Sequence, residues 1–156
     1  MRAIFLDDMT NDVVLVEDDG YTTLPFMQAL VDGLIEFADI HSSPLTGYLD
    51  NPTPFNLRWE RMAMECTMAV NEEGMYNETF TWNRRASFLF SQTIVGPAVI
   101  VQMGENGETL PISLQNVVFL FDVLKANLPF QTMTVEEVCR KYIVPRGTMD
   151  VSEAWS

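Results

Sequence analysis

The chain has 156 residues, of which 47% are hydrophobic, and its 9 basic and 22 acidic residues give a formal net charge of −13. This composition fits one soluble globular domain and argues against wholesale disorder. A surface of this charge repels nucleic acid, and no apolar run reaches the ~20 residues of a membrane span or forms a signal peptide. We therefore expect a cytoplasmic protein without direct nucleic-acid or membrane contact.

The first part of the chain predicts a hairpin, a helix and a strand. Residues 3–6 and 13–16 are short apolar runs separated by turn-forming residues, which is typical of a β-hairpin whose loop carries acidic side chains. The apolar spacing after Gly20 predicts a helix of about three turns that ends at Gly33. Residues 34–40 then predict a strand.

The middle of the chain predicts a long loop, two strands and a short helix. Residues 42–56 contain three prolines and no periodicity, so we expect a loop there. Residues 62–70 alternate and predict a half-buried strand, whose methionines we assign to the core in preference to a binding groove. After a turn at 71–74, we expect a short aromatic strand over 76–80 and a helix capped by Asn83.

The last third predicts one more hairpin and two helices. Residues 94–103 read as an apolar strand, and the Asn-Gly pair at 106–107 is a hairpin signal that leads to a second strand at 109–112. Helical spacing over 114–125 predicts the first helix, and the capping box that begins at Thr134 predicts the second.

The second of these helices is expected to dock onto the body of the protein. Thr134 and Glu137 supply the capping box, and Val138 belongs to its apolar stripe. We expect the chain beyond this helix to be loose, so that deletion after Val144 leaves the fold intact.

These elements predict an α+β domain with a mainly antiparallel sheet and helices packed on one face. We divide the chain into residues 1–103, a hairpin and two-helix extension at 104–146 packed on the same core, and a loose C-terminal tail at 147–156. Cys66 and Cys139 lie in apolar patterns, so we expect two buried thiols and neither a disulfide nor a metal site.

Acidic residues are concentrated in the first half of the chain, where residues 1–80 hold 15 acidic and 3 basic side chains. Six of them fall between positions 7 and 19: Asp7, Asp8, Asp12, Glu17, Asp18 and Asp19. Such asymmetry indicates an interaction face, although a solvated, solubilising face is the simpler reading. The spacing fits no EF-hand, so a metal site or a catalytic carboxylate pair is disfavoured.

A second polar group combines two acidic residues with two arginines. Arg84 and Arg85 follow the predicted cap Asn83, in a first helical turn where basic side chains oppose the helix dipole. We expect one arginine to pair with Glu72 or Glu73. The alternative is a small-ligand site, in which these residues and the helix start hold a nucleotide or another phosphate.

Residues suited to catalysis are scarce. The single histidine, His41, precedes Ser42 and Ser43, but sequence neighbours rarely form a nucleophile and base pair. The cysteines have no C-x-x-C spacing, and no phosphate-binding glycine loop follows a strand. We therefore expect no enzyme activity, no cofactor and no metal.

Four segments of the chain resemble an uncharacterised family of small phage- and plasmid-borne bacterial proteins that share a conserved domain of unknown function. The matching segments are Val31-Asp32-Gly33-Leu34-Ile35-Glu36, Asn71-Glu72-Glu73-Gly74, Asn83-Arg84-Arg85-Ala86-Ser87 and Ile94-Val95-Gly96-Pro97-Ala98-Val99-Ile100-Val101. The resemblance covers residues 1–103, while a longer loop after Ser42 and the extension after Met103 depart from the family pattern. It implies a mobile genetic element acting in a bacterial host and does not imply a reaction.

The leading functional hypothesis is therefore a non-enzymatic phage accessory protein in the host bacterial cytoplasm. It would bind and modulate a host protein with a basic surface through its acidic face, as a nucleic-acid mimic or an anti-defence inhibitor. The alternative is the phosphate-binding protein described above, and a virion component is a third reading. A homodimer is plausible because the aromatic residues Phe80, Trp82, Phe88 and Phe90 could leave one set of rings outside the core.

Overall fold

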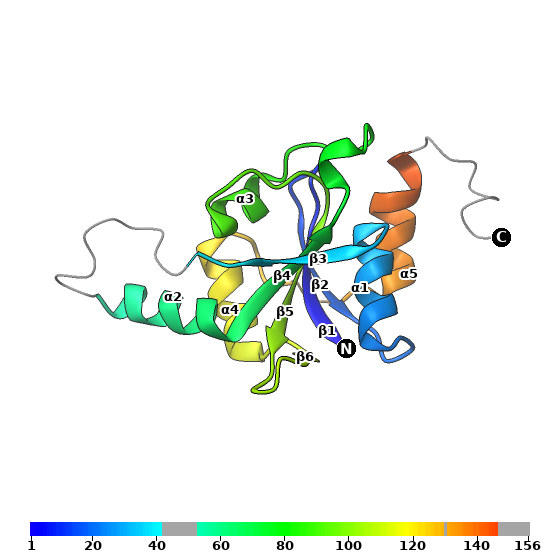
Figure 1. The fold of residues 1–156 in the computed structure, drawn as a ribbon. Helices are drawn as coiled ribbons and strands as arrows, with labels where there is room; N and C mark the ends of the chain where they lie inside the picture. The colour runs from blue at the N-terminus through cyan, green and yellow to red at the C-terminus, as the bar shows by residue number, and fades with distance from the viewer. Residues whose placement is uncertain (42–52, 130, 147–156) are drawn as a thin grey trace.

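The computed structural model describes residues 1–41, 53–129 and 131–146. Its centre is an antiparallel sheet with strand order β2-β1-β5-β4-β3, to which β6 adds by pairing with β5 (Figure 1). The strands are β1 (Arg2–Leu6), β2 (Val13–Glu17), β3 (Ile35–Asp39), β4 (Cys66–Asn71), β5 (Ala98–Met103) and β6 (Thr109–Leu110). This confirms the predicted α+β class with an antiparallel sheet.

The helices cover both faces of the sheet. They are α1 (Thr23–Val31), η2 (Gly74–Tyr76), α2 (Pro54–Glu65), α3 (Arg84–Phe90), α4 (Leu114–Val123) and a last helix that runs through α5 (Val135–Val138), η3 (Cys139–Ile143) and η4 (Val144–Arg146). Figure 1 shows α1 and α5 on one side of the sheet and α2 and α4 on the other. The expectation that all helices pack on one face is therefore wrong.

The register of the strands explains why two layers of helices are needed. One row of residues crosses the sheet on one face: Leu15, Ile4, Ile100, Met68 and Ala38. The next row crosses it on the other face: Val14, Phe5, Val99, Ala69 and Phe37. Because both rows are apolar, either face would expose hydrophobic surface if no helix covered it.

Each face has its own cluster of buried side chains. On the first face, the strands pack against side chains of α2, α3 and α4, among them Trp59, Leu89 and Phe121. On the second face they pack against α1 and the last helix, through residues such as Phe26 and Val138. Residues 104–146 thus contribute to the same two clusters as residues 1–103.

The predicted strand over residues 62–70 is partly wrong, because α2 continues to Glu65 and only β4 is extended. Thr53 caps α2 by accepting a hydrogen bond from the Asn56 backbone N–H, and a proline occupies its first turn. Trp59 and Met62 then fall on one buried face of this helix. The strand-like alternation of side chains over 62–65 hides this helical spacing in the sequence. The described part of the predicted 42–56 loop therefore begins a helix, and residues 42–52 lie outside the described residues.

The short strand expected over residues 76–80 is also absent from the described structure, where η2 and a turn occupy these positions. The Asn77 side chain accepts hydrogen bonds from the backbone N–H and the hydroxyl of Thr79. This local side-chain to backbone bonding competes with a strand and favours a turn.

The remaining predicted elements form, but β5 begins at Ala98 instead of residue 94 and β6 ends at Leu110 instead of residue 112, and the predicted tail at 147–156 lies outside the described residues. The first hairpin, α1, β3 and the β5–β6 hairpin all form, and Asn83 and Ser113 cap α3 and α4. The capping box at Thr134 and Glu137 is present, and the last helix docks with Val138 fully buried. Both cysteines are free and buried, and burial raises the pKa of Cys66 to about 12 and that of Cys139 to about 11.

Candidate functional site

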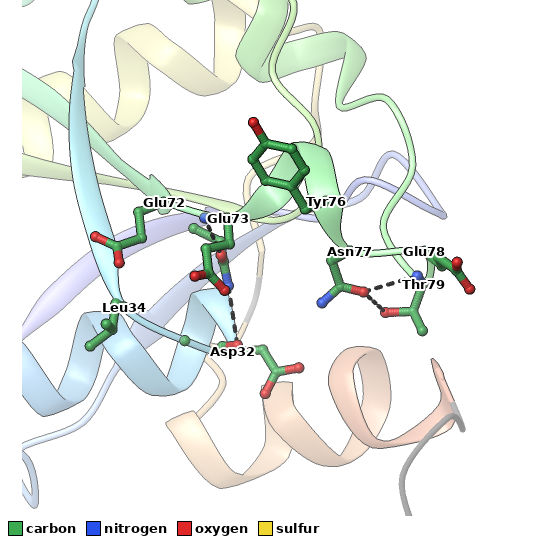
Figure 2. A pocket seen from close by; sticks show the side chains of 10 residues that line it. Asp32, Leu34, Glu72, Glu73, Tyr76, Asn77, Glu78 and Thr79 are labelled. Carbon is green, nitrogen blue, oxygen red and sulfur yellow. Dashed lines mark hydrogen bonds between the residues drawn. The ribbon is translucent and has the colours of Figure 1, made fainter.

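A hollow of about 410 Å³ lies where three connecting segments meet at one end of the sheet. The turn from α1 to β3, the turn after β4 and the segment after η2 form its walls (Figure 2). Its lining residues are Asp32, Gly33, Leu34, Asn71, Glu72, Glu73, Tyr76, Asn77, Glu78 and Thr79. We refer to it as the acidic hollow.

The buried side chain of Asn71 joins two of these walls. Its amide nitrogen donates to the carbonyl oxygens of Val31 and Asp32, at 3.0 and 3.1 Å. Its side-chain oxygen accepts from the Glu73 backbone N–H at 2.8 Å. Asn71 therefore satisfies carbonyl groups at the end of α1 and fixes the turn that carries the glutamates.

Two glycines allow close approaches of the backbone, one at the hollow and one beside it. A Cβ atom at Gly33 would lie 2.5 Å from the Asn71 amide nitrogen, and one at Gly74 would lie 2.5 Å from the Val95 carbonyl oxygen. Both separations are shorter than a non-bonded contact permits. Gly33 thus lets the turn between α1 and β3 approach Asn71 at the hollow, whereas Gly74 lets η2 approach the Val95 backbone, which does not line the hollow.

The hollow gathers negative charge and has no cation among its lining residues. Four of its lining residues are carboxylates: Asp32, Glu72, Glu73 and Glu78. No lysine or arginine lines it, and none of these four carboxylates forms an ion pair with another residue of the described ranges. Figure 2 shows the side chains of Glu73 and Asn77 on one side and that of Asp32 on the other.

Asp32 lies at the edge of the hollow, where its carboxyl is partly removed from solvent. Partial burial raises the pKa of the Asp32 carboxyl above its ordinary value, and the charge of Arg146 opposes that shift. Asp32 also has a left-handed backbone, with φ of 59°, where it ends α1. Its position is thus set by the helix end, at the edge of the hollow.

The predicted acidic face is not one face. Asp7 and Asp8 are buried, with side chains 1% and 0% exposed, and both pair with Arg146, whose side chain is 4% exposed. The Arg146 Nη2 atom lies 2.8 Å from Asp7 Oδ1 and also pairs with Asp8, while Nη1 donates to Asp8 Oδ2 at 3.0 Å. We call these three residues the Arg146 cluster.

The surrounding backbone completes the Arg146 cluster. Asp7 accepts from the N–H and the hydroxyl of Thr10, and Asp8 accepts from the Thr81 N–H. Asp7 and Asp8 therefore cannot serve as an exposed interaction surface. Deletion after Val144 would remove Arg146 and leave two buried carboxylates unpaired, so we now expect this deletion to destabilise the fold, in contrast to the expectation from the sequence.

The other four predicted acidic residues are dispersed. Asp12 accepts a hydrogen bond from the Tyr142 hydroxyl at 2.8 Å, and Asp18 accepts from the Gly20 and Val135 backbone N–H groups. Burial, with the bond to Asp12, raises the pKa of Tyr142. Glu17 and Asp19 are exposed and lie 3.6 Å from Arg2 and the N-terminal amine, respectively. Asp12 and Asp18 thus bond to the last helix, while Glu17 and Asp19 stay at the surface.

The predicted phosphate site is largely occupied by internal hydrogen bonds. Asn83 caps α3 and donates to the carbonyl oxygens of Leu6 and Gly96, at 3.0 and 2.9 Å. Arg85 donates to the carbonyl oxygens of Asn11 and Leu124. Asn83 and Arg85 thus connect segments of the fold.

Arg84 has a different setting. Its guanidinium lies 5.2 Å from the centre of the Trp82 ring, at a second hollow of about 500 Å³ that Asp8 also lines. Neither Arg84 nor Arg85 pairs with Glu72 or Glu73 among the described residues, so that expectation is wrong.

No arrangement suited to a metal ion emerges from the described parts of the chain, which contain no group of three or more His, Cys, Asp or Glu side chains placed to hold one. The carboxylates of the hollow are therefore spread around a space instead of converging on a point. A spread of this kind suits an extended organic cation, such as a lysine or arginine side chain, better than a metal ion. No helix in these parts is long and apolar enough to cross a membrane.

Comparisons of the chain with protein-family models, curated proteins and solved structures found no match. The resemblance of residues 1–103 to the phage- and plasmid-borne family therefore stays a prediction. Within the structure, the matching segments meet in pairs: Asn71 bonds to the Val31–Glu36 segment, and Asn83 bonds to Gly96 of the Ile94–Val101 segment.

Sequence reasoning missed Asp32 and Glu78 at the hollow, and Arg146 beside Asp7 and Asp8. Asp32 precedes a glycine at a predicted helix end, a signal that places it in a turn but does not reveal its neighbours. Arg146 is 138 and 139 residues from its two partners, so no local pattern connects them.

Proposed function

We propose that the protein is a non-enzymatic binding protein whose acidic hollow receives a basic segment of a partner protein. The observation that carries this proposal is the set of four carboxylates around one hollow, without a lysine or arginine among the lining residues. Like charges held together raise the free energy of the unbound surface, and an incoming cation relieves this repulsion. Tyr76 also lines the hollow and is 88% exposed, so its ring is available to a cation.

The setting of this function rests on the family resemblance of residues 1–103. In that setting the protein is an accessory protein of a phage or plasmid in the bacterial cytoplasm, and its partner is a host protein that it modulates. The acidic hollow replaces residues 7–19 as the acidic surface in this proposal, because Asp7 and Asp8 are buried and share the cation Arg146. A basic nucleic-acid-binding surface of the host is one partner with the required charge.

The test is capture of partners from a bacterial lysate on immobilised protein, at low and at high salt, with identification by mass spectrometry. We expect basic proteins to bind at low salt and to be released as salt rises. The double substitution Glu72→Lys/Glu73→Lys should abolish this capture. The matched control, Glu105→Lys/Asp122→Lys, makes the same change in net charge at exposed positions outside the hollow and should retain it.

Two outcomes would overturn the proposal. One is capture of partners by the Glu72→Lys/Glu73→Lys protein at the wild-type level. The other is an equal loss of capture in the control protein, which would show that net charge, and not the hollow, determines binding. A thermal-shift screen with mono-, di- and cyclic nucleotides tests the phosphate-binding alternative. We expect no increase in melting temperature, because Asn83 and Arg85 are engaged within the fold.

A further inference from the structure

The two edges of the sheet differ in whether another described segment of the chain bonds to them. At the β2 edge, residue 133 forms a bridge: the Glu17 backbone N–H donates to the Met133 carbonyl, and the Met133 N–H donates to the Leu15 carbonyl, both at 3.0 Å. At the opposite edge, β3 pairs only with β4 among the strands of the described chain (Figure 1). The chain thus covers one edge with its own backbone and leaves β3 as the other.

The register identifies the backbone groups that β3 presents outward. The Glu72 N–H donates to the Leu34 carbonyl, so residues 34, 36 and 38 direct their backbone groups toward β4. The alternate residues Ile35, Phe37 and Asp39 direct theirs away from the sheet. No hydrogen bond from these outward groups to another described residue is present. β3 therefore offers three donor and acceptor pairs to an added strand.

The side chains along this edge combine apolar surface with negative charge. Leu34 and Phe37 are 60% and 52% exposed, and Glu36 and Asp39 are exposed as well. The carboxylates keep two copies of this edge apart by repulsion, a usual protection for a free edge. The same carboxylates attract an extended segment that carries lysine or arginine.

The edge is continuous with the acidic hollow. Asp32, Gly33 and Leu34 line the hollow, and β3 begins at the next residue, Ile35. A strand laid along the outer edge of β3 therefore has one end at the hollow. Every charged residue of the hollow lining and of β3 is acidic, so both features require the same kind of partner.

We infer that the partner binds as an added β-strand on the edge of β3 that no described strand pairs with, and that a lysine or arginine at the end of that strand lies in the acidic hollow. This inference rests on the proposed function and names the conformation of the bound segment. Backbone hydrogen bonds would supply affinity for any extended segment, and the hollow would select a basic one.

The test uses a short end-blocked peptide of alternating lysine and threonine, and the same peptide methylated on alternate backbone nitrogens. Both peptides carry the same charge, but methylation removes the donors that strand addition needs. We expect the methylated peptide to bind the wild-type protein about tenfold more weakly or worse, since one lost hydrogen bond of ~1.4 kcal/mol corresponds to that factor. Fluorescence anisotropy measures both affinities.

A variant of the protein provides the complementary test. Phe37→Pro removes an N–H group that points out of the sheet, so the fold should persist, as circular dichroism and the melting temperature would show. It should weaken binding of the unmethylated peptide by about tenfold. Backbone amide signals of Ile35 and Asp39 should shift on binding of this peptide to the wild-type protein.

The outcomes separate the inference from the proposed function. Equal binding of the two peptides to the wild-type protein would overturn strand addition, whatever the behaviour of the Phe37→Pro protein. If the Glu72→Lys/Glu73→Lys protein binds the unmethylated peptide as tightly as the wild type, the hollow is not the charge-recognition site and the proposed function fails. Loss in that variant together with equal binding of both peptides would keep the hollow and reject the strand.

Discussion

The Arg146 cluster and the acidic hollow lie at the same end of the sheet, but their carboxylates differ in burial and in pairing with a cation. Asp7 and Asp8 are almost fully buried, each satisfied by Arg146 and by neighbouring hydroxyl or N–H groups. The carboxylates of the hollow are exposed and have no cationic partner among its lining residues. Thr79 lies between the two, since it lines the hollow and its carbonyl accepts from Arg146 at 3.4 Å.

The number of acidic residues in a segment therefore does not locate an acidic surface. The acid-rich stretch at residues 7–19 is partly neutralised because the last helix brings an arginine to it. The hollow collects its carboxylates from the end of α1, the turn after β4 and the segment after η2. A single cation supplied by a distant element decides whether a carboxylate stabilises the core or remains available to a partner.

The largest expected effect comes from breaking the Arg146 cluster. Arg146→Met should lower the free energy of unfolding by about 3–5 kcal/mol, because it leaves two buried carboxylates without their cation. Urea unfolding measures the change. Arg140→Met is the control, since Arg140 pairs with Glu136 on the exposed surface and its loss should cost about 0.5 kcal/mol or less.

Replacement of both carboxylates tests the cause of this loss. Asp7→Asn/Asp8→Asn introduced into the Arg146→Met protein should recover part of the lost stability, because the unpaired charges are removed. Equal costs for Arg146→Met and Arg140→Met would contradict the assignment of Arg146 as the cation that neutralises the buried carboxylates.

An intermediate effect is expected at the hollow itself. Asn71→Ala leaves the Val31 and Asp32 carbonyls and the Glu73 N–H without their side-chain partner, so it should cost about 1–3 kcal/mol in unfolding free energy. Asn127→Ala, at an exposed position, should change stability by less than about 0.5 kcal/mol. If both variants melt at the same temperature, Asn71 does not hold the walls of the hollow together.

The smallest effect concerns the charge of Asp32. Because its pKa is raised in the folded protein, the folded state binds this proton more tightly than the unfolded state does. The ionised group therefore opposes folding at neutral pH, and this cost disappears as pH falls through the raised pKa toward 3.8, the ordinary value.

Asp32→Asn should consequently raise stability at pH 7 by a few tenths of a kcal/mol, a modest figure because the side chain is partly solvated. Asparagine also tolerates the left-handed backbone found at this position. The gain should shrink when unfolding is measured near pH 4. A gain that grows toward acid pH would contradict the sign of the shift, and Asp122→Asn on α4 serves as the matched control.

The local structure of this chain was predictable where short-range signals agree. The first hairpin follows from two apolar runs and a turn, and the caps at Asn83 and Thr134 follow from residue type and spacing. Prediction of α2 failed at residues 62–65, because their alternation fits a strand while Trp59 and Met62 fit a helix. The periodicity of these residues alone does not decide between a strand and a helix.

The candidate site was less predictable than the fold. The Asn71–Gly74 segment was singled out from its sequence, and it does form a wall of the hollow. Its expected partner, Arg84 or Arg85, instead faces Trp82 or the carbonyls of Asn11 and Leu124. Which carboxylates share a space depends on the end of α1 meeting the turn after β4, a tertiary arrangement that no spacing along the chain encodes.

The distance in sequence between Arg146 and its partners has a consequence for synthesis of the protein. Asp8 leaves the ribosome 138 residues before Arg146 does, a delay of roughly 7–30 seconds at ordinary elongation rates. Until then, the nascent chain carries two carboxylates at the end of its first strand that have no cation to neutralise them. Arrested nascent chains extended beyond residue 146 by a linker should resist protease, and those stopped before it should be digested. A premature stop before Arg146 therefore yields a product with two unpaired carboxylates near its N-terminus, which we expect proteases to degrade.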